Sequence, residues 1–179
     1  GYKKRKGEKY RRQPNGKKLT INVAVRNTQP NAEKIWTNYI QQWQKIGLDA
    51  KFVGGRPMEF NSWVQDVQAD SPKIDVFEGG WNLSSEPSPM DLYSEGAPYN
   101  MARFVSPTQS KLLTNIDSTK AFNHKYRVQA FDKWQQWMYD NAYVVPTTNS
   151  WSVTAVNNKV TGWSLKPSAN SWYDVGFTK

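Results

Sequence analysis

Apolar and polar positions alternate along the first half of the chain in patterns typical of strands and helices. Residues 19–27 alternate apolar and polar side chains, which predicts a strand. Residues 28–48 carry apolar side chains at helical spacing and reach Gly47, a residue type common at helix ends. The patterns continue as a strand at 49–55, a helix at 58–69 and a strand at 73–80. This order predicts an α/β fold with a mostly parallel sheet flanked by helices.

The second half contains a long irregular segment followed by two helical patterns. Residues 81–106 hold several prolines and only scattered apolar residues. A run of this length inside a compact domain is usually a binding or lid segment. A short helix is predicted to begin at Ser106, and a longer one, capped by Asn123, to follow it. Residues 142–158 are rich in β-forming residues, although Pro146 restricts the first part to an edge strand.

Positive charge is concentrated at the start of the chain. The formal net charge is +9, and residues 1–18 hold nine lysines and arginines against the single acid Glu8. The remaining residues are nearly balanced, with 15 basic and 14 acidic side chains. A basic arm that contacts phosphates is one interpretation, but we favour a solvated leader that bridges two lobes. No nucleic-acid partner is therefore expected.

The residue types needed for most catalytic and metal sites are absent or isolated. The chain has no cysteine, and its one histidine, His124, lies in the first turn of a predicted helix among polar neighbours. Thiolate, triad and N/S-ligated metal chemistry therefore have no support, and no metal or cofactor is expected. Asp75 and Glu78 face opposite sides of a predicted strand. We expect a non-catalytic protein, with a carbohydrate-binding or glycosidase-like domain that uses exposed tryptophans as the alternative.

Trp81 interrupts the pattern at the end of the third predicted strand. It follows Gly79 and Gly80 and does not continue an apolar face. Open α/β sheets bind ligands beyond the carboxyl ends of their strands. The glycines would let the backbone of a ligand approach closely, with the indole of Trp81 forming a wall. The alternative is that Trp81 seals the end of the sheet beneath the irregular segment, and the residues alone leave both interpretations open.

The order of these segments resembles that of a known family. The chain contains, in this order, a helix ending in KIGL, a strand, a helix with an aromatic residue near its start, DVFEGGW, a proline-rich loop and a long helix leading into AYVVP. Together they resemble the C-terminal lobe of extracellular solute-binding proteins of the oligopeptide- and dipeptide-binding class, over about residues 17–163. The resemblance implies a periplasmic-binding-protein-like lobe that binds an extended peptide without catalysis and presents it to the membrane subunits of an ABC importer.

The same resemblance implies roles for particular residues. Trp81 matches the tryptophan that forms a wall of the peptide site, and Phe60 matches an aromatic residue that lines a side-chain pocket. Members that bind short peptides hold the α-amino group with an aspartate three residues after the tryptophan, where this chain has Ser84. Without that carboxylate we expect the peptide termini not to be gripped. The full set of expected peptide-binding residues is Trp81, Asn82, Ser84, Phe60, Gly80 and Glu86.

The resemblance also implies how the chain is organised and where it works. Residues 1–18 would form a basic leader between lobes, residues 19–163 the substrate-binding lobe, and residues 164–179 an irregular tail returning toward the other lobe. That other lobe would be an N-terminal lobe of the same full-length protein. The protein would be extracellular, either a lipoprotein at the cell surface anchored through the N-terminal region, or periplasmic.

Overall fold

The computed structural model describes residues 1–82, 86–149, 153–164 and 173–178. These residues form two compact units, Gly1–Val144 and Val145–Lys179, and each unit is described by itself. Among the described residues, no helix is both long and apolar enough to span a bilayer.

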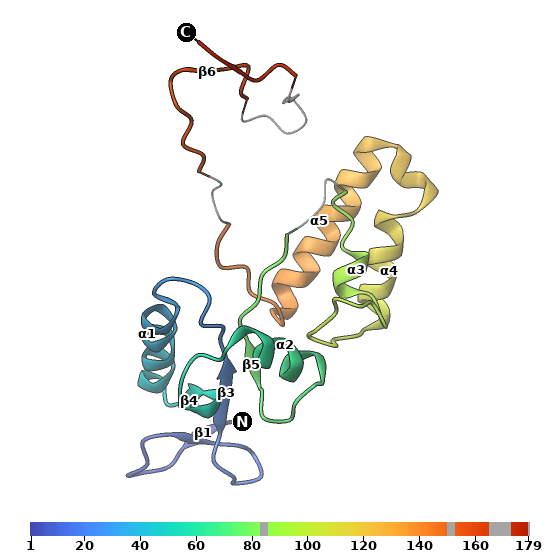
Figure 1. Ribbon diagram of the computed structural model, residues 1–179. Coiled ribbons are helices and arrows are strands. Elements are labelled where there is room, and N and C mark those ends of the chain that lie inside the picture. Colours follow the sequence, from blue (N-terminus) through green and yellow to red (C-terminus); the bar gives the residue numbers. More distant parts are fainter. Residues whose placement is uncertain (83–85, 150–152, 165–172, 179) are drawn as a thin grey trace. The chain divides into compact units, whose positions relative to one another are not determined.

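The centre of the first unit is a three-stranded parallel sheet (Figure 1). Strands β3 (Thr20–Ala24), β4 (Asp49–Phe52) and β5 (Val76–Phe77) are arranged in the order β4-β3-β5. Both neighbours run parallel to β3. The predicted α/β class and mostly parallel sheet are therefore confirmed. Strand β5 is shorter than the predicted 73–80, although backbone hydrogen bonds beside both of its ends continue the contact with β3.

Two helices cover opposite faces of this sheet. Helix α1 (Ala32–Lys45) packs against Val23 and Val25, and the shorter α2 (Phe60–Gln68) packs against Ala24. Successive strand residues point to opposite faces, so these three neighbours, all fully buried, belong to two separate cores. Strand β3 is thus buried on both faces as well as paired along both edges.

A group of helices completes the first unit. This group consists of α3 (Met90–Tyr93), α4 (Pro107–Ile116) and α5 (His124–Asn141). A short 3-10 helix, Thr119–Phe122, connects α4 to α5. The two predicted caps are confirmed, because the side chain of Ser106 accepts from the backbone N–H of Gln109 and that of Asn123 accepts from the N–H of Tyr126. Burial raises the pKa of Tyr143, whose hydroxyl accepts from Gln109, to about 12.

Residues 1–18 form an ordered hairpin. Strands β1 (Lys3–Lys4) and β2 (Arg11–Arg12) pair antiparallel. Arg11 joins this hairpin to the sheet: its N–H donates to the carbonyl of Gly47 at 2.7 Å, and its carbonyl accepts from Leu19 just ahead of β3. The hairpin therefore lies at the amino-terminal edge of the sheet, where β3 begins.

In the described part of the second unit, β6 (Val160–Thr161) pairs antiparallel with β7 (Gly176–Phe177). The expectation of strands at 142–158 is wrong for the described part of that range, which contains no strand. Residues 150–152 of that range lie outside the described residues. The predicted boundaries at 18/19 and 163/164 stay predictions.

Candidate ligand-binding site

The candidate site lies where the strand order of the sheet reverses. The chain passes from β3 to β4 on one side and then returns to β5 on the other side of β3. Adjacent strands whose connections leave in opposite directions create a crevice beyond their carboxyl ends, the usual ligand site of open α/β sheets. Here those ends belong to β3 and β5.

An ion pair joins these two strand ends. Arg26 follows β3 and Glu78 follows β5, and their side chains form two hydrogen bonds, with Nη2 2.6 Å from Oε1 and Nε 3.1 Å from Oε2. The side chains are only 14% and 18% exposed. The Arg26 guanidinium also lies 5.1 Å from the ring centre of Trp63, a buried residue of α2. The floor of the crevice is therefore fixed in shape and close to neutral in charge.

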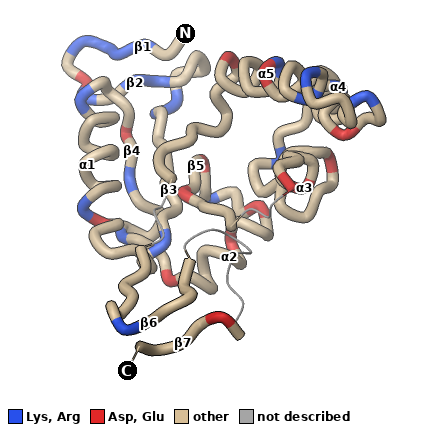
Figure 2. The backbone as a smooth tube through the Cα atoms, turned by 90° about the horizontal axis from the view of Figure 1, so that it is seen from above, with Lys and Arg blue, Asp and Glu red and all other residues tan. Residues whose placement is uncertain are grey.

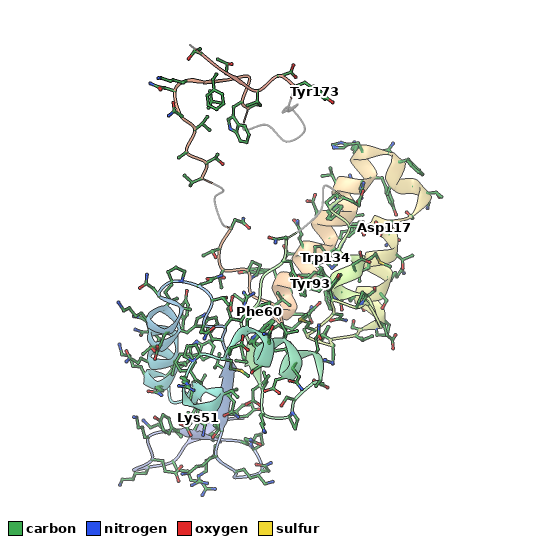
Figure 3. All side chains as sticks on the ribbon, in the orientation of Figure 1. Lys51, Phe60, Tyr93, Asp117, Trp134 and Tyr173 are labelled. Carbon is green, nitrogen blue, oxygen red and sulfur yellow. The ribbon has the colours of Figure 1, made fainter. Side chains whose placement is uncertain are left out.

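The amino terminus of α2 reaches the same edge. Met58 donates to the carbonyl of Val25 at 2.7 Å, which holds the residue just ahead of the helix beside the end of β3. The Glu59 carboxylate accepts from the N–H groups of Asn61 and Ser62, and these bonds hold its pKa below the usual value. Phe60, the first residue of α2, is 42% exposed (Figure 3).

Gly79 and Gly80 continue β5 into this crevice and are both exposed. Neither has a positive φ. A Cβ atom built on Gly79 would come no closer than 3.5 Å to Phe77, and one on Gly80 no closer than 3.7 Å to Arg26, which are ordinary contacts. The fold itself therefore does not require glycine at either position.

Trp81 directly follows these glycines and is partly exposed to solvent. Its side chain is 41% exposed, and its ring centre lies 5.4 Å from that of Tyr99 in an edge-to-face arrangement. Tyr99 comes from the irregular segment, so this segment supports one side of the indole and leaves the rest open. Asn82 follows and is exposed.

A hollow of about 630 Å³ opens at the same carboxyl edge of β3. The loop after β3, the first turn of α1 and the residues ahead of α2 line it. Two acidic side chains, Glu33 and Glu59, and two basic ones, Lys34 and Arg56, are among its lining residues. These formal charges cancel, so the hollow carries no net charge that would select a charged ligand.

Two of the expected site residues are not placed in this crevice. Ser84 lies outside the described residues. Glu86 forms an ion pair with Arg127 of α5 and lines a different hollow, of about 360 Å³, with residues from the end of α4 to the start of α5. Trp81, Gly80 and Phe60 thus lie at the carboxyl edge of the sheet, while Glu86 contacts the helical group.

The side chains considered for catalysis are engaged in the structure. Asp75 accepts from the backbone and side-chain nitrogens of Asn22, and Glu78 is paired with Arg26. Across the described ranges there is no group of three His, Cys, Asp or Glu residues arranged to hold a metal ion. The exposed residues described at the crevice include Trp81, Phe60 and the two glycines, which offer aromatic and backbone groups for binding.

The sequence interpretation missed Arg26 and Tyr99. A charged residue near the carboxyl end of each of two predicted strands could have indicated the Arg26–Glu78 pair, because the carboxyl ends of parallel strands meet at one edge. No such signal existed for Tyr99, since the irregular segment has no periodicity from which a contact could be predicted.

Comparisons with known proteins agree with this architecture. No family model matches the chain. The chain is 44% identical over 179 residues to the oligopeptide-binding protein OppA of Lactococcus lactis subsp. lactis (strain IL1403), covering 98% of this chain and 30% of that protein. A shorter OppA sequence from Lactococcus lactis subsp. cremoris is 46% identical over 103 residues, which are 57% of this chain and 83% of that relative.

A solved structure matches almost the whole chain. Lactococcal OppA, described as complexed with an endogenous peptide in the closed conformation, superposes with a TM-score of 0.86 at 41% sequence identity, over 98% of this chain and 33% of that one. The fold and the crevice thus define a periplasmic-binding-protein-like lobe. The chain belongs to the OppA family of oligopeptide-binding proteins, whose members are binding proteins by name. It spans 30% of the length of the first of these relatives.

The Arg26–Glu78 pair should contribute measurably to stability. In a double-mutant cycle with Arg26→Met and Glu78→Gln, we expect a coupling of about 1–2 kcal/mol, because each change leaves a largely buried charge without its partner. The Arg103–Asp70 pair is a matched control, since it is longer, at 3.4 Å, and more exposed. Its coupling should stay below about 0.5 kcal/mol. Urea unfolding measures both, and equal couplings for the two pairs would contradict the assignment.

Proposed function

We propose that this chain is the peptide-binding lobe of a longer solute-binding protein. It holds an extended oligopeptide in the crevice at the carboxyl ends of β3 and β5. The observation that carries the proposal is the half-exposed indole of Trp81 beside two exposed glycines that the fold does not require. The names of the relatives, and the peptide described in the structure of lactococcal OppA, support the choice of ligand.

The arrangement suits recognition of a peptide backbone. A peptide lying along the exposed residues that follow β5 would meet glycines, which offer N–H and C=O groups and no side chains. In binding of this kind, an extended peptide pairs alongside exposed strand backbone. Main-chain hydrogen bonds then provide affinity, and alternate side chains enter pockets. Phe60 and the nearby hollow, whose formal charges cancel, would then accept side chains of varied character.

The proposed contacts are Trp81, Asn82, Gly80 and Phe60, with Ser84 as a polar contact. Glu86 remains a proposed contact on the condition that a ligand competes with its ion pair to Arg127. A peptide of sufficient length would have to extend toward the helical group to reach it.

The proposal includes partners and a location. A second lobe, N-terminal in the same full-length protein, would form the opposite wall of the crevice, and closure of the two lobes would enclose the peptide. The membrane subunits of an ABC importer would receive it. The protein would work outside the cytoplasmic membrane, at the cell surface through a lipid anchor or in the periplasm.

The carbohydrate-binding alternative has no support in these observations. The relatives are named for peptides. Asp75 and Glu78, the acidic side chains beside β5, are both bound by other side chains of the protein.

Removing the indole of Trp81 should weaken peptide binding. In the full-length protein that contains this chain, Trp81→Ala should raise the Kd for an oligopeptide by about 30-fold, as loss of a central aromatic contact does in other interfaces. The matched control is Tyr139→Ala, since Tyr139 is 81% exposed on α5 and has no place in the crevice. Isothermal titration calorimetry measures both, and an unchanged Kd for the Trp81 variant would contradict the proposal.

The peptide amino terminus should contribute little to affinity. Because Ser84 replaces a carboxylate, acetylating the amino terminus of a long peptide should change its Kd by less than about three-fold, whereas loss of a charge-assisted anchor costs about tenfold or more. Titrations with matched free and acetylated peptides decide this. A tenfold loss on acetylation would show that another group, such as Glu86, grips the terminus.

A further inference from the structure

The amino-terminal hairpin carries a concentration of charge that peptide binding does not use. Residues 1–18 contain nine lysines and arginines and one acid, while the rest of the chain is nearly balanced. Figure 2 shows basic residues gathered along β1 and β2, with both signs of charge elsewhere. The hairpin lies at the amino-terminal edge of the sheet, opposite the carboxyl edge that holds Trp81.

The acid of the hairpin does not offset its exposed cations. Glu8 is engaged by Arg12, with the closest contact at 2.6 Å, and this pairing holds the pKa of Glu8 below its usual value. Seven other cations of the segment are exposed and form no ion pair with an acidic side chain among the described residues. They are Lys3, Lys4, Arg5, Lys6, Lys9, Lys17 and Lys18.

Arg11 fixes this charged surface to the body of the protein. Its Nε donates to the carbonyl of Ile46 at 2.9 Å, at the carboxyl end of α1, where a positive charge is favourable. Gly47 has a φ of 89°, and a Cβ there would come within 3.3 Å of the Arg11 side chain. The cations are thus presented on an element that is hydrogen-bonded to the body of the protein.

We propose that this hairpin binds the surface of an anionic lipid bilayer. Clusters of four to eight basic residues are attracted to anionic headgroups without a shaped pocket, and neither described hollow includes a hairpin residue. Tyr2, 54% exposed next to Lys3, adds an aromatic side chain of the type that lies at membrane interfaces. The charge of the hairpin alone does not distinguish lipid from nucleic acid. The choice of lipid rests on the proposed function, which places the protein beside a membrane.

The orientation follows from the two edges of the sheet. If the amino-terminal edge contacts the bilayer, that contact does not cover the crevice at the carboxyl edge, which faces the proposed second lobe. The attraction would be electrostatic and would weaken as salt screens it. Lipid binding and peptide binding would then be separable by substitution.

Sedimentation with lipid vesicles tests the proposal. The full-length protein, prepared without covalent lipid, should bind vesicles containing about a third phosphatidylglycerol and not vesicles of pure phosphatidylcholine. Replacing Lys3, Lys4, Lys6 and Lys9 with Gln should weaken binding about five-fold per lysine, hence by more than about a hundredfold. The charge-matched control replaces four exposed lysines of the helical group, Lys111, Lys120, Lys125 and Lys133, and should lose less than about three-fold.

The outcomes are distinct from those of the peptide experiments. Both quadruple variants should bind peptide with the affinity of the unaltered protein, and Trp81→Ala should bind vesicles normally. Equal losses in the two quadruple variants would overturn the proposal, because net charge alone would then explain binding. It would also be overturned if duplex DNA bound as tightly as the anionic vesicles at the same salt concentration, or if neither vesicle type bound.

Discussion

The double-sided burial of β3 is the constraint on which the rest of the structure depends. Val23, Ala24 and Val25 are all fully buried, and the alternation of a strand sends them into two different cores. One helix must therefore cover each face, and a slip of one residue in register would exchange the faces. With β4 and β5 on opposite sides of β3, the strand order reverses beside β5, and the crevice appears at that point.

The two edges of the sheet have different chemistry. At the carboxyl edge, Arg26 and Glu78 neutralise each other, and aromatic rings and exposed glycines form the surface, which suits ligands of varied sequence. At the amino-terminal edge the hairpin gathers most of the excess positive charge of the chain. Because the strands separate these edges, a ligand at one leaves the other free. The proposed peptide binding uses the first edge, and the proposed lipid binding uses the second.

Much of this architecture could be predicted from the sequence, because strong periodicity reports burial directly. The helical pattern within residues 28–48 and the capped helix after Asn123 are present as predicted. The expectation of strands at 142–158 failed for the described residues, since β-forming composition does not provide a pairing partner. The exposure of Trp81 depends on the distant Tyr99 and the Arg26–Glu78 pair depends on strand order, so neither follows from local pattern.

Hydrogen–deuterium exchange of the full-length protein with and without an oligopeptide tests the central claim most directly. The account predicts that peptide slows exchange in the segment 78–82, at the end of β5, and leaves the hairpin segment 1–18 unchanged. Protection confined to the helical group between residues 86 and 127, with no change at 78–82, would contradict the assignment of the crevice.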